Sequence, residues 1–466
     1  MMNRHNKVLA FLLALICIVS LISGCSGPAP AKPTEPAPAV DAAKVDAPAV
    51  ADTPAAVADA PAVTDAPAVA DAPAAKVDAP KEAAQKTKLV FYGNRTGEPS
   101  WEKMVNATIA LHPELDVQVI DIDWANIDKI IKTGIAAGNP PDLTHCWPMQ
   151  LRPYVNAGQS LDLTPYLEEN DGAWKKTFPA ELLDIGKYDG KYYGVPYQST
   201  FPTFYVNVTM FKACGVEVPT GEWTWQQFMD TCATIKAKQN IAPFALARDV
   251  NSWMARLGTS GYAAADGKLA EFAAGKMDFT QNYVPQTMKN IKDLYDNKYW
   301  YPGEGALNVT RDEAKTAFVQ GKAAIIAEVN LIYPELINQV DFEIAPVLWP
   351  AMAEKTLVVG GTDGFMIPAN AANKDGAVAF MKTFLSPEIQ QQRADASYPV
   401  AVNGVSVSDP IVLQLMEQTK FLVNSDFINV SAKVQDYVVN QLTANYILNK
   451  GDGAIADLEK LRKQAE

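Results

Sequence analysis

The residue types that most often perform catalysis are scarce in this sequence. The chain has three histidines, and His5 lies in a short leader, which leaves His112 and His145. A Ser-His-Asp or Cys-His arrangement would have to use one of these two, and no Gly-x-Ser-x-Gly elbow occurs. Because His112 precedes Pro113 at the end of a helical pattern, we interpret it as a helix-terminal residue. The sequence therefore does not support nucleophilic catalysis.

Metal and nucleotide chemistry lack their sequence patterns as well. No His-Glu-x-x-His or Cys-x-x-Cys spacing occurs, so we expect no metal site. The run Gly360-Gly361-Thr362-Asp363-Gly364 is a glycine-rich turn without the lysine of a Walker loop, and we expect no cofactor. A glycoside hydrolase stays open as an alternative, because it needs only two carboxylates at a suitable separation, which a sequence does not give.

Length and charge limit the architecture and the partners. The chain has 466 residues, a formal net charge of −13 and 48% hydrophobic residues. This length favours two lobes once the non-globular parts are removed. The acidic balance argues against a nucleic-acid partner, because binding phosphates needs clustered Lys and Arg.

The first 25 residues have the features of a lipoprotein leader. Arg4 and Lys7 precede an apolar run, Val8–Leu21, that is too short for a comfortable membrane span. The run ends in Leu-Ile-Ser-Gly-Cys25, which resembles the bacterial lipobox, whose cysteine is acylated. We predict a signal peptide over residues 1–24 and a lipid on Cys25 that anchors the chain at the extracytoplasmic face of a bacterial cell membrane. The alternative is an ordinary secretory signal that contains a cysteine.

Residues 25–85 follow as a tract rich in Ala, Pro, Val and Asp, in which Asp-Ala-Pro-Ala recurs. The tract has no aromatic residue, so it cannot bury enough surface to offset its ordering entropy. We predict a disordered tether.

Three cysteines remain beyond it, and Cys214 and Cys232 form either a bridge or, with Cys146, three buried thiols.

The globular region begins near Lys86 with an α/β rhythm. We predict strands over residues 89–92, which are apolar, over 117–119, where valines alternate, and briefly over 142–144. Helical stripes separate them, the first capped by Ser100 and the second over residues 127–135. Strands that alternate with helices in this way predict a parallel sheet.

A second set of elements follows residue 205. Thr224 and Gln227 have the spacing of a capping box, which predicts a helix that starts at Thr224. The remaining predicted elements are strands over 323–327, 342–345 and 358–368 and helices over 374–385, 434–448 and 453–464.

The order of several short motifs resembles the extracellular solute-binding proteins of ATP-driven importers, in the maltose-binding-protein-like group (family 1). The resemblance covers residues 86–466. The motifs, in chain order, are Gly138-Asn-Pro-Pro-Asp-Leu, Leu161-Asp-Leu-Thr-Pro-Tyr-Leu, Asp189-Gly-Lys-Tyr-Tyr-Gly-Val-Pro, Tyr205-Val-Asn, Val218-Pro-Thr with Trp225-Gln-Gln-Phe, Phe318-Val-Gln-Gly-Lys-Ala-Ala and Gly361-Thr-Asp-Gly-Phe-Met-Ile-Pro.

The resemblance implies a two-lobed α/β fold of the periplasmic-binding-protein type (type II), with a ligand cleft between the lobes. We place one lobe at 86–196 plus 356–397 and the other at 203–350 plus 401–466. Crossovers are expected near 197–202, 351–355 and 398–400. Open α/β sheets bind ligands beyond the carboxyl ends of their strands, which agrees with such a cleft.

The family's frequent ligands are sugars, which pack their C–H faces on aromatic rings and pair their hydroxyls with planar polar side chains. Both kinds of side chain occur in loops that follow strands or cross between lobes. The predicted ligand contacts are Asn94, Arg95, His145, Trp147, Gln198, Asn251, Trp253, Glu328, Asn330, Asp363 and Tyr398.

Each candidate also has a structural interpretation. Trp101 lies on an apolar helical face and is expected in the core. The resemblance implies the same for Trp225, which matches a helix-start tryptophan that packs structurally in the family. Trp147 and Trp253 fit either the cleft or the core. Arg95 is either a ligand contact or a solvated loop charge, and His145 is equally able to cap a loop.

The resemblance implies a monomeric carrier, not an enzyme, that binds a small solute, expected to be a mono- or oligosaccharide. Closure of the lobes would present the solute to the permease subunits of an ABC transporter. Two other functions use the same cleft or surface: a sensor that feeds a kinase, and an adhesin.

Overall fold

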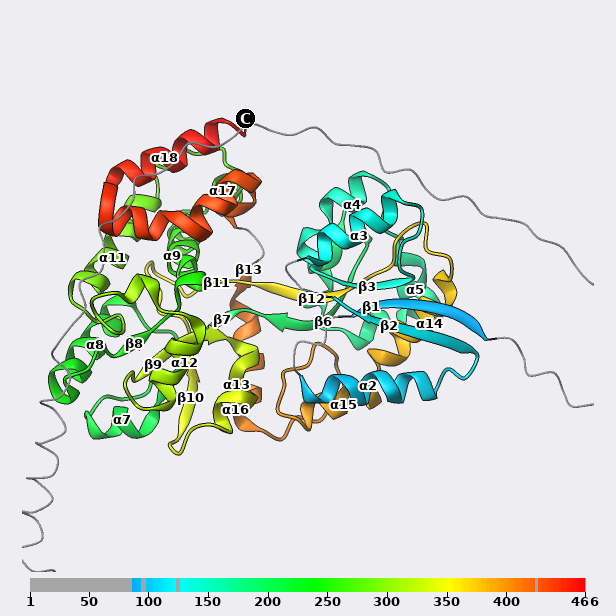
Figure 1. Cartoon of the computed structure of the whole chain (residues 1–466), viewed down its shortest axis with the longest axis horizontal. Coiled ribbons are helices and arrows are strands. Elements are labelled where there is room, and N and C mark those ends of the chain that lie inside the picture. Colours follow the sequence, from blue (N-terminus) through cyan, green and yellow to red (C-terminus); the bar gives the residue numbers. More distant parts are fainter. Residues whose placement is uncertain (1–85, 94–97, 123–125, 424–425, 466) are drawn as a thin grey trace, which may run out of the picture. The chain divides into compact units, whose positions relative to one another are not determined.

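The computed structural model describes residues 86–93, 98–122, 126–423 and 426–465, all within one compact unit. The two largest sheets of this unit have separate hydrophobic cores (Figure 1). We call the five-stranded sheet with its helices the first lobe, and the four-stranded sheet with its helices the second lobe. Among the described residues, no helix has both the length and the apolarity needed to cross a membrane.

The first lobe contains the parallel strands that the sequence predicted. Its strands are, in sheet order, β2 (Leu115–Asp121), β1 (Thr87–Gly93), β3 (Leu143–Cys146), β12 (Gly361–Met366) and β6 (Val195–Thr200). β1 pairs in parallel with β2 and with β3. β12 runs antiparallel to β3 and to β6, so it enters the sheet from the opposite end.

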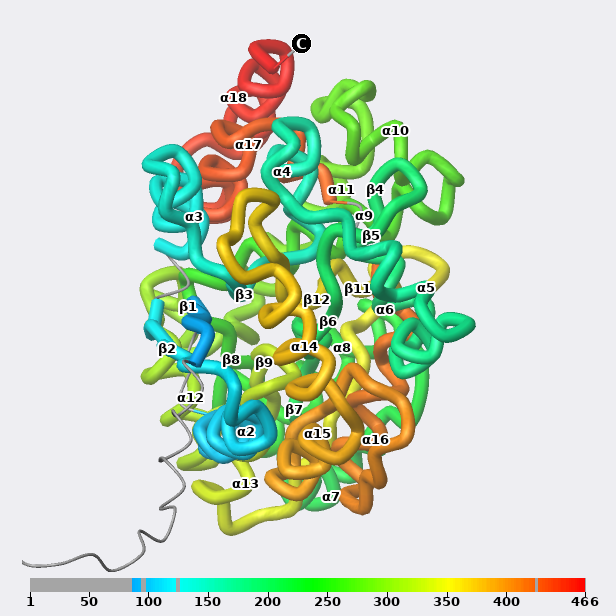
Figure 2. Tube along the Cα trace, turned by 90° about the vertical axis from the view of Figure 1, so that its right-hand side faces the viewer, coloured from blue at the N-terminus to red at the C-terminus, as the bar shows by residue number. Residues whose placement is uncertain are grey.

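Helices cover both faces of this sheet because alternate strand residues point to opposite sides. Leu89 and Phe91 of β1 are fully buried toward one face, and Tyr92 packs toward the other. The first face is covered by α2 (Pro99–Ala110), α14 (Lys374–Phe384) and α15 (Pro387–Ala394), and the second by α3 (Ile127–Ala136) and α4 (Arg152–Asn156). Figure 2 shows α2 beside α15, although the two helices are far apart in the sequence.

Smaller elements complete the first lobe. They are α5 (Thr164–Gly172), α6 (Ala180–Leu183) and a hairpin of β4 (Lys187–Tyr188) and β5 (Lys191–Tyr192).

The predicted cap at Ser100 is wrong. Glu98 has extended backbone angles and occupies the cap position, and Pro99 takes the first helical position. Proline suits that position because its fixed φ is helical and its missing N–H would have no partner there. Ser100 therefore lies inside the first turn, where its hydroxyl donates to the Glu98 carboxylate.

The second lobe has a sheet in the order β10 (Ile344–Val347), β7 (Pro202–Asn207), β9 (Ile325–Val329) and β8 (Phe244–Ala245). The capping box at Thr224 is confirmed, because the Gln227 amide N donates to Thr224 Oγ1 at 3.1 Å and Gln227 Oε1 accepts from the Thr224 amide at 2.7 Å. The helices are α7 (Val208–Ala213), α8 (Trp225–Gln239), α9 (Ser252–Ala265), α10 (Leu269–Ala273), α11 (Val284–Asp296), α12 (Arg311–Val319), α13 (Tyr333–Ile337), α16 (Pro410–Glu417), α17 (Ala432–Tyr437) and α18 (Asp452–Lys463).

Some predicted elements have different limits in the structure. The strand predicted over 358–368 divides into β11 (Val358–Val359) and β12, and β11 pairs with β13 (Leu422–Val423). The helix predicted over 434–448 is α17 followed by two π-helical segments, Val438–Leu442 and Asn445–Lys450. Cys146, Cys214 and Cys232 are buried free thiols.

The chain passes between the two lobes three times in the described region. β6 of the first lobe continues through Phe201 into β7 of the second lobe. Residues 348–360 lead from β10 back to β12, and residues 395–409 lead from α15 to α16. We refer to Phe201 with the adjoining ends of β6 and β7 as the first crossing segment, to residues 348–360 as the second, and to residues 395–409 as the third.

Candidate functional site

Two adjoining cavities lie where the lobes face each other. The larger has a volume of about 920 Å³ and the smaller about 280 Å³. Both draw their lining from both lobes, and both are lined by the same four residues: Trp147, Thr200, Val329 and Asp363. The shared lining joins the two cavities into one cleft between the lobes.

Aromatic rings from three predicted residues line this cleft. Trp147 follows β3, is partly exposed and borders both cavities. Tyr398, in the third crossing segment, lines the larger cavity, with the guanidinium of Arg393 5.1 Å from its ring centre. Trp253, near the start of α9, lines the smaller cavity and is 9% exposed, with the guanidinium of Arg311 5.9 Å from its ring. The cleft therefore offers flat apolar faces from both lobes.

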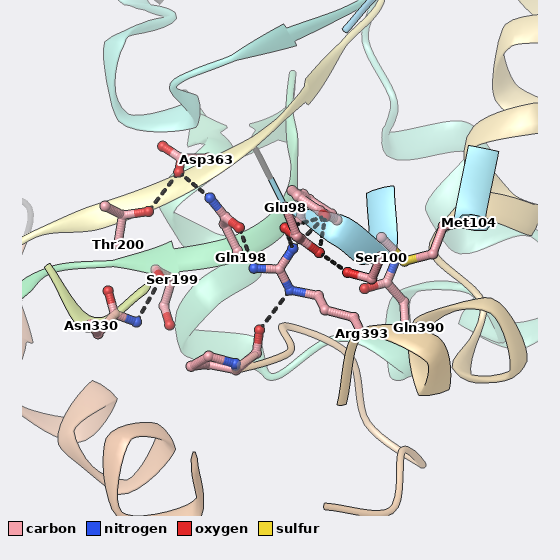
Figure 3. Close-up of polar contacts among 12 residues, drawn as sticks. Glu98, Ser100, Met104, Gln198, Ser199, Thr200, Asn330, Asp363, Gln390 and Arg393 are labelled. Carbon is pink, nitrogen blue, oxygen red and sulfur yellow. Dashed lines mark hydrogen bonds and ion pairs between the residues drawn. The ribbon is translucent and has the colours of Figure 1, made fainter. Parts of the chain in front are cut away.

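Asp363 and Gln198 lie opposite each other on β12 and β6, at a register shift in the pairing of the two strands. Asp363 Oδ2 accepts a hydrogen bond of 2.6 Å from Gln198 Nε2 and another of 2.6 Å from Thr200 Oγ1 (Figure 3). Burial raises the pKa of Asp363, although the hydrogen bonds from Gln198 and Thr200 and the charge of Arg393 act in the opposite direction. Asp363 is 6% exposed and borders both cavities, so its carboxylate is available as a hydrogen-bond acceptor for a ligand.

The raised pKa of Asp363 predicts a measurable pH dependence. The folded state holds this proton more tightly than the unfolded state, so the contribution of Asp363 to stability is complete below its unfolded pKa and is lost as pH rises through its folded pKa. Asp363→Asn keeps an oxygen that can accept both hydrogen bonds but does not titrate. Between the unfolded and folded pKa values of Asp363, the free energy of unfolding of the Asp363→Asn variant minus that of wild type should therefore rise with pH. The slope should be at most about 1.4 kcal/mol per pH unit. Urea unfolding from pH 4 to pH 8 tests this, and a difference that is independent of pH would contradict it.

Arg393 is a central residue of the cleft, and it was not predicted from the sequence. Its side chain is fully buried on α15 and lines the larger cavity. It forms an ion pair with Glu98 and donates hydrogen bonds to the Tyr197 hydroxyl, to Gln198 Oε1 and, at 2.9 Å, to the Pro399 carbonyl oxygen (Figure 3). A weak signal was available, because Arg393 follows the apolar Ile389 by four residues and shares its helical face.

Glu328 reaches the cleft through Arg311. Arg311 Nε lies 3.1 Å from Glu328 Oε1 and 3.3 Å from Asp249 Oδ2, and Arg311 lines the larger cavity. Burial raises the pKa of Glu328, and the charge of Arg311 partly offsets this effect. The carboxylate therefore orients Arg311 from below the cavity surface.

Asn330 has a structural position. It is fully buried, its Oδ1 accepts from the Phe201 amide at 3.0 Å, and its Nδ2 donates to the Ser199 carbonyl oxygen at 3.0 Å. Both partners belong to the first crossing segment or its edge. Asn330 thus holds that segment to the second lobe, and its buried side chain lines neither cavity.

His145 and Asn251 are also buried. The His145 ring stacks on Phe365, with ring centres 4.6 Å apart, and packs against Trp101. Burial lowers the pKa of His145 to about 3, so the ring is neutral at physiological pH. Asn251 is 7% exposed and immediately precedes α9. Neither residue lines the two cavities, and we leave both out of the contact set proposed below.

The structure brings together most of the remaining predicted contacts. Trp147, Gln198, Trp253, Asp363 and Tyr398 line the cleft, and Glu328 contacts it through Arg311. Asn94 and Arg95 lie outside the described residues. The predicted core positions of Trp101 and Trp225 are confirmed, because both are buried within hydrophobic clusters.

The cleft combines ring faces with neutral and charged planar groups and has the size of a ligand pocket. Such pockets range from about 300 to 1,000 Å³, and the larger cavity alone lies near the upper end. Its charged side chains are held by partners within the protein: Glu98 with Arg393, Glu328 with Arg311 and, at 2.6 Å, Arg256 with Asp426. This arrangement is suited to binding a polar molecule with flat apolar faces.

Comparisons with known proteins agree on one family. A sequence model described as "Bacterial extracellular solute-binding protein" matches residues 103–411. Binding proteins of Brucella abortus (strain 2308) and Brucella suis biovar 1 (strain 1330) are each 24% identical over 302 residues, which is 61% of this chain and 68% of theirs.

Solved structures show the same fold. A chitin oligosaccharide binding protein has a TM-score of 0.68 at 23% identity and aligns over 82% of this chain and 99% of its own. RafE, a solute-binding protein solved with raffinose, has a TM-score of 0.64 at 20% identity, over 82% and 100% of the two chains. The GacH receptor of Streptomyces glaucescens, solved with acarbose, has a TM-score of 0.66 at 17% identity, over 82% and 98%.

Proposed function

Because the chain belongs to the bacterial extracellular solute-binding proteins, which are binding proteins and not enzymes, we propose that it carries a carbohydrate to the permease of an ABC transporter. The observation that supports this most is the cleft, lined from both lobes by Trp147, Trp253 and Tyr398 together with the planar side chains of Gln198 and Asp363. Membership of the family also makes the protein extracytoplasmic and removes the glycoside hydrolase alternative.

An oligosaccharide fits this cleft better than a single sugar. Rings stack on the C–H faces of sugars, and Gln198 and Asp363 pair with neighbouring hydroxyls. Aromatic side chains lie in both cavities, so successive sugar rings have separate faces to occupy. Among the structurally similar proteins, one is named as a chitin oligosaccharide binding protein and two were solved with raffinose or acarbose, which supports this choice.

Binding is proposed to close the lobes. A ligand favours the closed arrangement only if it gains contacts there that the open arrangement lacks, and a lining shared by both lobes meets that requirement. The proposed contact set is Trp147, Gln198, Trp253, Asp363, Tyr398 and Arg311, with Glu328 acting through Arg311.

The proposal keeps the membrane attachment and lobe limits expected from the sequence. A lipid on Cys25 and a tether over 25–85 would hold a monomer within reach of its permease. The lobes are taken as 86–196 plus 356–397 and 203–350 plus 401–466, with two corrections: Val358 and Val359 pack in the core of the second lobe, and Val402 packs in the core of the first.

A thermal-shift screen of the full-length protein tests the ligand class. The panel holds raffinose, chitin oligosaccharides, xylan oligosaccharides and monosaccharides, with amino acids, peptides and polyamines as controls. A ligand of micromolar affinity at millimolar concentration should add about 4 kcal/mol to the free energy of unfolding and raise the melting temperature. We expect the shift with an oligosaccharide series. A shift with a control alone would discard the carbohydrate and keep the binding role.

A further inference from the structure

One hydrogen-bonded network reaches all three crossing segments at their first-lobe ends, and Arg393 is at its centre. Gln198, which accepts from Arg393, lies on β6 just before the first crossing segment. Pro399, whose carbonyl oxygen accepts from Arg393 Nε, lies in the third crossing segment. Asp363, which accepts from Gln198, lies on β12 just after the second.

The guanidinium group suits this position because it presents five donors in a rigid plane. Arg393 uses that plane between the rings of Tyr197 and Tyr398, 4.5 Å and 5.1 Å from their centres. The Glu98 carboxylate neutralises its charge, and the Tyr197 hydroxyl donates to Glu98 Oε2 at 3.1 Å. The group is therefore held from every side and cannot change one partner without disturbing the others.

The same network forms part of the cleft. Arg393, Gln198, Asp363 and Tyr398 all line the larger cavity. A ligand that contacts Gln198 or Asp363 thus contacts groups that fix how the crossing segments leave the first lobe.

We propose that Arg393 is a positioning residue that fixes the three crossing segments to one another and so confines the lobes to a defined hinge motion. The proposal goes beyond the proposed function, and only its ligand-bound part rests on it. Without the guanidinium, the third crossing segment would lose its link to β6 and β12, which stay paired with each other, and the lobes would sample a wider range of orientations.

The test measures the distance between the lobes in full-length protein. Cys17 and Cys25 are replaced by serine, and the three remaining cysteines are buried. Fluorescent labels are placed at Lys129→Cys on α3 and Ala237→Cys on α8, both exposed positions. Single-molecule energy transfer then gives the interlobe distance distribution without any ligand, so this readout does not depend on the ligand's identity.

Arg393→Lys keeps the charge near Glu98 but supplies a single donor group in place of the planar fork. We expect a broader distribution than in wild type without ligand. The matched control is Arg462→Lys on α18, which weakens another buried ion pair, that with Glu459, at a site distant from the crossing segments. A merely structural role for Arg393 predicts that both variants lose stability and that both keep the wild-type distribution, which would overturn the proposal.

Tyr197→Phe provides a second variant if Arg393→Lys does not fold. It removes only the hydroxyl that contacts Arg393 and Glu98, and a smaller broadening is expected. A wild-type distribution in this variant would also count against the proposal.

Addition of raffinose or chitin oligosaccharides separates this proposal from the proposed function. If a probe binds, the wild type should move to a new distance, and Arg393→Lys should bind about tenfold more weakly because fewer molecules have the competent orientation. If no probe shifts the wild type, carbohydrate-driven closure fails, while the ligand-free comparison still decides the role of Arg393.

Discussion

Arg393→Met should lower the free energy of unfolding by about 3–5 kcal/mol, the largest stability effect that we expect from a single substitution in the cleft. The ion pair with Glu98 is buried, with the two side chains 0% and 7% exposed. Methionine fills a similar volume but leaves the Glu98 carboxylate in the interior without its cation, and it also removes the donors to Gln198 and Pro399. Urea unfolding followed by circular dichroism measures the loss.

The double variant Glu98→Gln with Arg393→Met is the control for this prediction. Removing both charges eliminates the unpaired carboxylate, so the double variant should be more stable than Arg393→Met alone. A loss below about 1 kcal/mol in the single variant, the range typical of exposed ion pairs, would show that Glu98 remains solvated without Arg393.

Trp147→Ala should weaken ligand binding by about 1–3 kcal/mol, roughly a 5- to 150-fold rise in Kd, with little change in stability. Trp147 is partly exposed and borders both cavities, so its ring can stack on a sugar without being part of the interior. Isothermal titration with the ligand from the thermal-shift screen gives Kd, and urea unfolding gives the stability.

Trp174→Ala is the matched control, because this residue belongs to the same lobe but lies in its core. Trp174 is 8% exposed and packs against Phe178, with ring centres 5.8 Å apart. Its removal should cost about 3–5 kcal/mol of stability and leave Kd unchanged. If Trp147→Ala instead loses stability and keeps its affinity, then Trp147 is a core residue and the proposed contact set is incorrect.

The fold could be predicted from the sequence where local patterns and the sheet agree. The capping box at Thr224 depends on two side chains and two backbone amides within four residues, so its sequence spacing is sufficient. The parallel strands β1, β2 and β3 follow from their alternation with helices. At α2 the prediction of Ser100 as the cap failed. Pro99 takes the first helical position, which it suits, and this places Glu98 at the cap.

The candidate site could be predicted only in part. Trp147, Gln198, Asp363 and Tyr398 line the cleft because chain segments that leave or cross between sheets run along its surface, a rule that needs only the order of elements. His145 was predicted to follow a strand, but β3 extends to Cys146, so His145 lies within the strand and its ring packs on Phe365 in the core. Which side faces the core depends on helices supplied by distant parts of the chain.

Arg393 and Glu98 could not be predicted as a pair. They are 295 positions apart, and each occurs in a helix-start or helix-end setting where a solvated charge is the usual outcome. Only the packing of α15 against α2 buries the two charges together.

The two anchors of the first crossing segment act on neighbouring residues from opposite lobes. Arg393 holds Gln198 on the first-lobe side, and Asn330 holds the Ser199 carbonyl on the second-lobe side. Under the proposed closure, the hinge within this segment is therefore about one peptide unit long. The displacement of a second-lobe residue grows with its distance from this hinge. Gln198 and Asp363, both on first-lobe strands, keep their spacing at every opening angle, whereas Arg311 and Glu335 of the second lobe move relative to them. A sugar ring bound near this hinge contacts Gln198 and Asp363 before the lobes close. Sugar units bound farther from the hinge gain their second-lobe contacts only when the lobes close.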